Sequence, residues 1–174
     1  HTCGLHPDGS VECWGNDCCG QTSPPASVFT QIAAGGFYTC GIRDDATVAC
    51  WGVNDSGQAT PPTGTFTQIA TGARHACGLR TDGTAACWGE NNGGQTIPPP
   101  GTFTQLSADI VGSSSCGVRA TGTVECWGIP SYWDMPAETF TSVSIHSGIC
   151  GLGTDGTVTC WPESFTVESP RRDN

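Results

Sequence analysis

Short runs of apolar and β-branched residues alternate with glycine- and proline-containing turns along the whole chain. Within residues 75–89, two such runs flank the pair Asp82-Gly83. An Asp-Gly pair between two such runs is typical of a β-hairpin. Asp8-Gly9 and Asp155-Gly156 stand in the same setting. The pattern therefore predicts a hairpin motif that recurs from one end of the chain to the other.

A pair of cysteines marks each predicted hairpin, the second ten residues after the first and directly before a tryptophan. If Cys77 faces Cys87, Arg80 lies opposite Thr84, and the loop between them ends in Gly83 in the left-handed conformation. Directly opposed residues of antiparallel strands are roughly 4.5 to 5.5 Å apart, which is within reach of a disulfide. We therefore expect the bridges Cys3–Cys13, Cys40–Cys50, Cys77–Cys87, Cys116–Cys126 and Cys150–Cys160.

Two further cysteines, Cys18 and Cys19, occupy the repeat positions of Asp55 and Ser56. They form a vicinal bridge, link to another chain or remain free, and the sequence does not choose among these states. A zinc site would need short cysteine knuckles or paired histidines, and neither spacing recurs. We expect no metal and no cofactor.

A second marker fixes the length of the repeat. The segments beginning at Phe29, Phe66, Phe103 and Phe140 share an FTxI-like pattern, and a fifth copy is Phe165-Thr166-Val167. Several short strands per unit and a constant period are typical of propeller blades. We expect an all-β, propeller-like domain over 1–174, with five short blades of one disulfide hairpin each. Its units cover about 1–28 (completed by 165–174), 29–65, 66–102, 103–139 and 140–164.

After the tryptophan, Gly52 to Gln58 matches Gly15 to Gln21 and Gly89 to Gln95. The combination of FTxIAAG, CGL, a DGT turn, CWG and GQ resembles the repeats of the regulator of chromosome condensation superfamily. It looks most like the disulfide-bearing form in the ectodomains of Crinkly receptor kinases. The resemblance implies a β-propeller. Functions within the superfamily differ too much for one to be carried over.

The ends of the chain complement each other. His1-Thr2-Cys3 matches His75-Ala76-Cys77 without a preceding FTxI strand, and Phe165-Thr166-Val167 is a spare copy of that strand. An unpaired strand edge is a template for strand addition. The tail either closes its own first blade or joins a neighbouring molecule head to tail. The fourth unit lacks the GQ segment and is shorter than the others, so a closed ring would be irregular. This length difference favours pairing of the tail with a neighbouring molecule.

The amino-acid composition indicates the compartment in which the protein folds and limits the kinds of partner that it can bind. Twelve cysteines in 174 residues indicate an oxidising, extracellular location. The net charge is −10, there is no lysine, and the six arginines are scattered, which argues against nucleic acid as a partner. No apolar run is long enough for a membrane span, and no signal peptide precedes His1. We expect a mature secreted chain or a fragment of a longer one.

Catalytic motifs such as HExxH, GxSxG or a phosphate-binding loop are missing from the sequence, so we expect a non-enzymatic protein. His1 resembles a terminal copper ligand but shares the repeat position of His75, which favours a structural role. Asp44 and Asp45 fall at a hairpin turn and are interpreted as solvated turn residues. The recurring tryptophans are interpreted as blade core rather than as an aromatic ligand strip.

Loops between the FTxI segments and the hairpins vary most among the units, and variable loops on a regular scaffold are where binding is built. The candidate binding residues are Phe37, Tyr38, Arg74, His75, Asp109, Ile110 and His146. Asn54-Asp55-Ser56 is an N-glycosylation sequon, and we expect it to be occupied. Segments rich in Thr, Ser and Pro, such as Thr60-Pro61-Pro62-Thr63, are candidate O-glycan acceptors or rigid turns.

Two functional hypotheses follow. The first is a glycosylated extracellular structural protein that assembles with copies of itself through Phe165, Thr166 and Val167. The second is a monomeric secreted or receptor-ectodomain binding module, which recognises another extracellular protein or a glycan through the variable loops.

Overall fold

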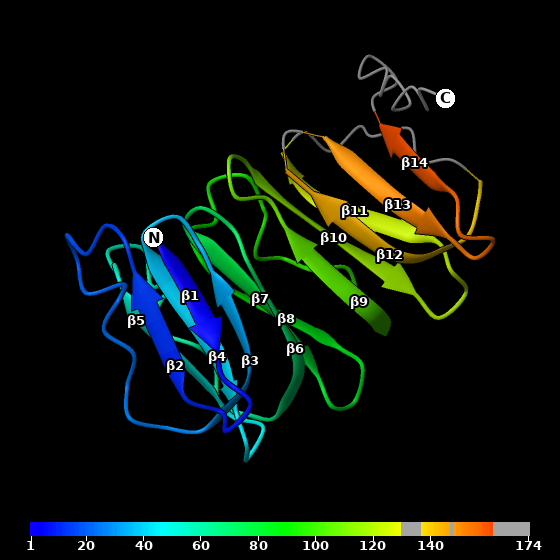
Figure 1. Ribbon diagram of the computed structural model, residues 1–174. Coiled ribbons are helices and arrows are strands. Elements are labelled where there is room, and N and C mark those ends of the chain that lie inside the picture. The colour runs from blue at the N-terminus through cyan, green and yellow to red at the C-terminus, as the bar shows by residue number, and fades with distance from the viewer. Residues whose placement is uncertain (130–136, 147, 162–174) are drawn as a thin grey trace, which may run out of the picture.

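The computed structural model describes residues 1–129, 137–146 and 148–161, and its elements are all strands (Figure 1). No described element is a helix that could cross a membrane. The strands are β1 (Thr2–Leu5), β2 (Val11–Trp14), β3 (Phe29–Ala34), β4 (Tyr38–Arg43), β5 (Val48–Gly52), β6 (Phe66–Thr71), β7 (His75–Arg80), β8 (Ala85–Gly89), β9 (Phe103–Ala108), β10 (Ser113–Arg119), β11 (Val124–Ile129), β12 (Phe140–Ile145), β13 (Ile149–Gly153) and β14 (Val158–Trp161).

The strands form five antiparallel sheets in chain order, as the sequence predicts. Four sheets have three strands, in the orders β3-β4-β5, β6-β7-β8, β9-β10-β11 and β12-β13-β14, and the first consists of β1 and β2. The FTxI strands β3, β6, β9 and β12 pack in succession, so consecutive sheets stand side by side. The first and last sheets lie at opposite ends of this array (Figure 1).

Each hairpin has the predicted register and bridge. Cys77 pairs with Cys87, and the equivalent cysteines pair in the other four hairpins, with Cα atoms 4.0 to 4.1 Å apart. The Arg80 N–H donates to the Thr84 carbonyl (2.8 Å), and Gly83 has a φ of 83°. The prediction of one disulfide-bridged hairpin per blade is confirmed.

A phenylalanine and a tryptophan fill each of the last four blades. Phe66 and Trp88 have ring centroids 6.3 Å apart, and the equivalent pairs are 5.2 to 5.6 Å apart. The Phe66 ring fits because residue 78 is a glycine, where a Cβ would lie 2.5 Å from the ring. The Trp88 indole N–H donates to the Gln58 carbonyl (3.0 Å), in the segment that follows the preceding hairpin. These tryptophans are buried core residues, as predicted.

Glutamine side chains join neighbouring FTxI strands. Gln68 Nε2 donates to the Leu106 carbonyl (3.0 Å), and the Leu106 N–H donates to Gln68 Oε1 (2.8 Å). Gln31 forms the same pair of bonds with Ile69, and Gln105 forms it with Val143. A side-chain amide thus continues the hydrogen bonding of the backbone from blade to blade.

Candidate recognition face

The loops that precede the hairpins of the second, third and fourth blades meet one another. The Ala73 N–H donates to the Asp109 carbonyl (3.2 Å), which joins the third loop to the fourth. The second and third loops touch at Gly36, where a Cβ would lie 2.8 Å from the Ala73 carbonyl oxygen. Close backbone contact between neighbouring loops requires the absence of a side chain at Gly36. Loops far apart in the sequence therefore form one continuous surface.

Three large apolar side chains of these loops face solvent. Phe37 is 55% exposed, Val111 is 61% exposed and Ile110 is 37% exposed. We call the surface formed by Phe37, Val53, Arg74, Ile110 and Val111 the recognition face. It contains a hollow of about 260 Å³, lined by Gly36, Phe37, Val53, Gln58, Ala73, Arg74 and Ile110.

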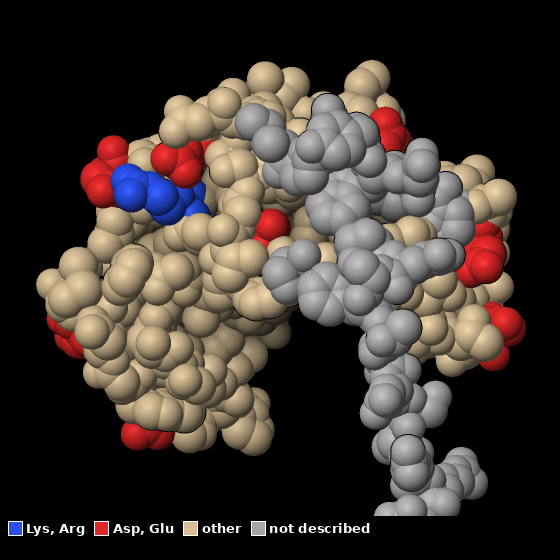
Figure 2. Space-filling view, turned by 90° about the horizontal axis from the view of Figure 1, so that it is seen from above, with Lys and Arg blue, Asp and Glu red and all other residues tan. Residues whose placement is uncertain are grey.

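Arg74 is the charged group of the recognition face, and acidic neighbours hold it in place. It forms ion pairs with Asp55 (2.9 Å) and Glu90 (3.7 Å), and it donates to Ser56 Oγ (3.0 Å). A hydrogen bond from Gln58 and the charge of Arg74 lower the pKa of Asp55. In the space-filling view, basic atoms gather in one small group beside acidic atoms on a mostly uncharged surface (Figure 2). The arginine is therefore preorganised rather than free in solvent.

The other predicted binding residues lie elsewhere. Tyr38 and His75 are buried within β4 and β7, and Asp109 is 7% exposed, with Oδ1 accepting a hydrogen bond from the Val111 N–H (2.9 Å). These three residues are therefore buried beneath the exposed loop residues and do not form part of the exposed surface. His146 is exposed in the fifth blade but does not line the hollow.

Burial also determines the hydrogen-bond partners and the pKa of His75. Its Nε2 contacts Ser115 Oγ (3.0 Å), and its carbonyl accepts a hydrogen bond from the Tyr38 hydroxyl. Burial lowers the pKa of His75 to about 4 and raises the pKa of Tyr38. His1 repeats the contact, with Nε2 2.8 Å from Thr39 Oγ1, which accords with the structural role expected from its repeat position. Among the described residues, no three His, Cys, Asp or Glu side chains converge as metal ligands.

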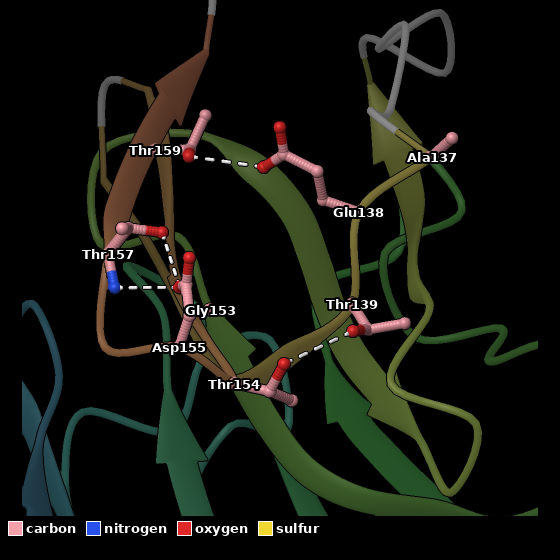
Figure 3. Close-up of a pocket in the computed structure, with 8 residues that line it drawn as sticks. All are labelled: Ala137, Glu138, Thr139, Gly153, Thr154, Asp155, Thr157 and Thr159. Atoms are coloured by element: carbon pink, nitrogen blue, oxygen red, sulfur yellow. Dashed lines mark hydrogen bonds between the residues drawn. The ribbon is translucent and has the colours of Figure 1, made fainter.

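A second hollow, of about 450 Å³, lies between the segment before β12 and the β13–β14 hairpin (Figure 3). Its polar side chains are engaged with one another: Asp155 Oδ1 accepts from the Thr157 N–H (2.9 Å) and hydroxyl (2.6 Å), and Thr139 contacts Thr154. The Asp155–Thr157 arrangement recurs at Asp45 and Asp82 in other blades. Repeated turn structure accounts for most of this hollow, so we do not assign it a ligand.

Among the described strands β1 pairs with β2 alone, and its other edge is a further exposed feature. Trp14 is 55% exposed, whereas its repeat equivalents, such as Trp51, are 8% exposed. A Cβ at Gly4 would lie 3.6 Å from the Trp14 indole, at a position where Gly41 faces the ring of Phe29. The first sheet thus has the glycine and the tryptophan of a blade, but no described FTxI strand covers them. The predicted strand, Phe165-Thr166-Val167, lies outside the described residues.

Sequence reasoning missed Val53, Asp55 and Glu90 as members or supports of the recognition face. Asp55 and Val53 lie in the segment after the tryptophan, which the repeat pattern marks as a turn. The signal available was the variation of this segment among units, where Val53 and Glu90 replace Asn16.

Comparison with known proteins agrees with this architecture. The model of the regulator of chromosome condensation (RCC1) repeat matches residues 29–58 and 66–95. No curated protein matches the chain.

Several solved structures share the fold. The entire ectodomain of the Physcomitrella patens receptor kinase CR4 is 29% identical, with a TM-score of 0.73 over 88% of this chain and 43% of that one. The CRINKLY WD40 ectodomain of Arabidopsis thaliana ACR4 is 24% identical, with a TM-score of 0.73 over 91% of this chain and 59% of that one. Human WBSCR16 is 15% identical, with a TM-score of 0.78 over 91% and 58%.

The chain spans about half the length of these neighbours. The resemblance inferred from the sequence is confirmed: residues 29–58 and 66–95 match the repeat of the regulator of chromosome condensation, and the chain is similar in structure to the ectodomains of Crinkly receptor kinases.

Proposed function

We propose that the protein is a non-enzymatic extracellular binding module that recognises another protein through the recognition face. The observation that carries the proposal is the convergence of Phe37, Ile110 and Arg74, from three successive blades, around one hollow. The five hairpin bridges and the ectodomain neighbours both point to an extracellular location.

The chemistry of the face suits a protein partner. Aromatic residues, phenylalanine among them, and arginine are enriched at protein interfaces relative to the rest of the surface. Burial of a Phe side chain stabilises a complex by about 1.5 to 3 kcal/mol, so one ring on a preformed surface contributes substantially to affinity. Arg74 is already held by Asp55 and Glu90, and less conformational entropy is therefore lost when a partner docks.

Binding of extracellular proteins to the immobilised chain tests the proposal. The Phe37→Ala variant should lose at least tenfold in affinity for the captured partner, as expected from removal of a central aromatic anchor. The matched control is Ile97→Ala, because Ile97 is 64% exposed but does not line the hollow. Equal binding by the native chain and Phe37→Ala would contradict the assignment.

We propose as a second candidate function assembly through the edge of β1 that no described strand covers. The exposed indole of Trp14 beside Gly4 favours addition of an FTxI strand, since a phenylalanine covers the equivalent glycine in the other blades. The donor proposed is Phe165-Thr166-Val167 of a second copy, joined head to tail. Light scattering of the intact chain and of a variant lacking residues 164–174 tests this candidate. Oligomers that disappear on deletion support it, whereas a monodisperse intact monomer excludes it.

We further propose that Asn54 carries a glycan. Asn54 is exposed, its Oδ1 accepts a hydrogen bond from the Ala59 N–H (2.9 Å), and its Nδ2 donates to Thr60 Oγ1 (2.9 Å). A glycosylated amide keeps one N–H, so the turn can persist after modification. Glycosidase treatment of the native secreted protein should reduce its mass and leave the Asn54→Gln variant unchanged. Equal mass before and after treatment would contradict the proposal.

A further inference from the structure

The turn after β2 carries two cysteines that take no part in the hairpin bridges. Cys18 and Cys19 are both exposed and free, with their sulfur atoms 2.7 Å apart. Adjacent thiols in contact, open to solvent, differ from the other ten cysteines, each of which is bridged within a hairpin.

Hydrogen bonds fix the backbone of this turn. The Cys18 N–H donates to Asn16 Oδ1 (3.0 Å), and the Cys19 N–H donates to Gln21 Oε1 (3.0 Å). Gln21 is 1% exposed, and its carbonyl accepts a hydrogen bond from the Trp51 indole (2.9 Å). The second blade therefore anchors the turn, and the two thiols are held together while their side chains remain accessible.

We propose that Cys18 and Cys19 form a thiol–disulfide exchange site whose substrate is a disulfide on another molecule. The thiolate of one cysteine attacks a sulfur of the substrate disulfide, which forms a mixed disulfide and releases one substrate thiolate. The second cysteine then attacks the mixed disulfide, closes the Cys18–Cys19 bond and releases the other thiolate. The cysteine pair is oxidised by two electrons, the substrate disulfide is reduced, and the two cysteine protons end on the two released thiols.

Because Cys18 and Cys19 are neighbours in the chain, the disulfide between them should be easily reduced, which makes the exchange reversible. Neighbouring Cα atoms are about 3.8 Å apart across a trans peptide, below the usual range of about 4.4 to 6.8 Å for a disulfide. Strained or exposed bridges are the labile ones, so a dithiol substrate should reopen the pair. The bridges of Cys40, Cys77 and Cys116 should not take part, because these three cysteines are fully buried.

The rate of exchange should rise with pH. A hydrogen bond with Cys18, followed by burial and the negative charges of Asp17 and Asp55, raises the pKa of the Cys19 thiol. Since the thiolate is the nucleophile, a raised pKa lowers the reactive fraction near neutral pH. Alkaline conditions restore this fraction.

Oxidised glutathione is the probe for the exchange, and alkylation followed by mass measurement is the readout. The native chain should lose both alkylatable thiols and retain no glutathione, because the second cysteine displaces it. Each single variant, Cys18→Ser or Cys19→Ser, should instead trap one stable glutathione adduct. A stable adduct on the native chain, thiols that stay alkylatable, or cysteines already linked to another chain would each overturn the proposal.

The same turn in the third unit offers a matched control. Asn92 and Gly93 stand at the positions of Cys18 and Cys19, and the Gly93 N–H donates to Gln95 Oε1 (2.8 Å) as the Cys19 N–H donates to Gln21. Asn92→Cys with Gly93→Cys, in a chain that lacks Cys18 and Cys19, should close as the native pair does. Failure to close would contradict the claim that this turn brings the thiols together. The reaction needs no partner at the recognition face and is independent of the proposed function.

Discussion

The side-chain amide of Gln68 forms hydrogen bonds with both backbone polar groups of Leu106, in the neighbouring blade. Leu106 is 1% exposed, so its N–H has little access to water if the amide is lost, whereas its carbonyl also accepts a hydrogen bond from Gln105 Nε2 (2.7 Å). A buried polar group without a partner costs about 1 to 3 kcal/mol. The Gln68→Met variant keeps the length of the side chain and removes both bonds.

We expect Gln68→Met to lower the free energy of unfolding by about 1 to 3 kcal/mol, measured by chemical denaturation. Thr67→Ala is the control, because Thr67 Oγ1 contributes a single, longer bond to the Leu79 carbonyl (3.3 Å) within its own blade. If the two variants lose the same stability, the glutamine bonds do not hold neighbouring blades together.

The hairpin turn of the second blade contains an alanine where the other hairpins have glycine. Ala46 has a φ of 66°, which is unfavourable for a residue with a Cβ. We expect Ala46→Gly to raise the free energy of unfolding by about 1 kcal/mol. Gly156→Ala is the matched reversal, since Gly156 has a φ of 85° and open space around its Cβ position. Gly156→Ala should lower the free energy of unfolding by about the same amount, about 1 kcal/mol. A Gly156→Ala variant that is more stable than the native chain would contradict this explanation of the turn.

Burial of His75 predicts a pH-dependent stability. Its pKa in the folded chain is about 4, below the ordinary value of 6.5, so the unfolded chain binds more protons between these two values. Stability should therefore fall as the pH decreases from about 6.5 to 4, by on the order of 3 kcal/mol at the lower end.

Denaturation curves recorded across this pH range measure the effect. His75→Gln should flatten the dependence, because Gln does not titrate. Carboxylates such as Asp82, whose pKa is lowered by hydrogen bonds from Thr84, contribute only at more acidic pH. An unchanged slope in His75→Gln would show that His75 is not the titrating group.

Local rules made much of the fold predictable from the sequence. The spacing of Cys77 and Cys87 and the turn at Asp82-Gly83 determine a register, and a register determines which residues pair. The first blade is described only in part, because the FTxI segment expected to complete the sheet of β1 and β2 lies outside the described residues. The joining of blades by Gln68 was also missed, although the glutamine recurs at Gln31 and Gln105.

The candidate site could be predicted only in part, because it depends on where each strand begins. β4 begins at Tyr38 and β7 begins at His75, and these strands are buried on both faces within their sheets. Phe37 and Arg74, one residue earlier, therefore reach solvent. Sequence patterns do not fix strand boundaries to one residue. The sequence prediction therefore groups each of these residues with its neighbour in the strand, Tyr38 or His75, although of these four only Phe37 and Arg74 line the hollow.

A photo-crosslinking measurement at Phe37 tests the central claim most directly. A photoreactive phenylalanine analogue replaces Phe37 in one protein and Ile97 in another, and each is irradiated with the extracellular partner captured by the native chain. The account predicts a covalent complex from position 37 and none from position 97, because the 260 Å³ hollow is lined by Phe37 and not by Ile97. Efficient crosslinking from position 97 together with none from position 37 would contradict it.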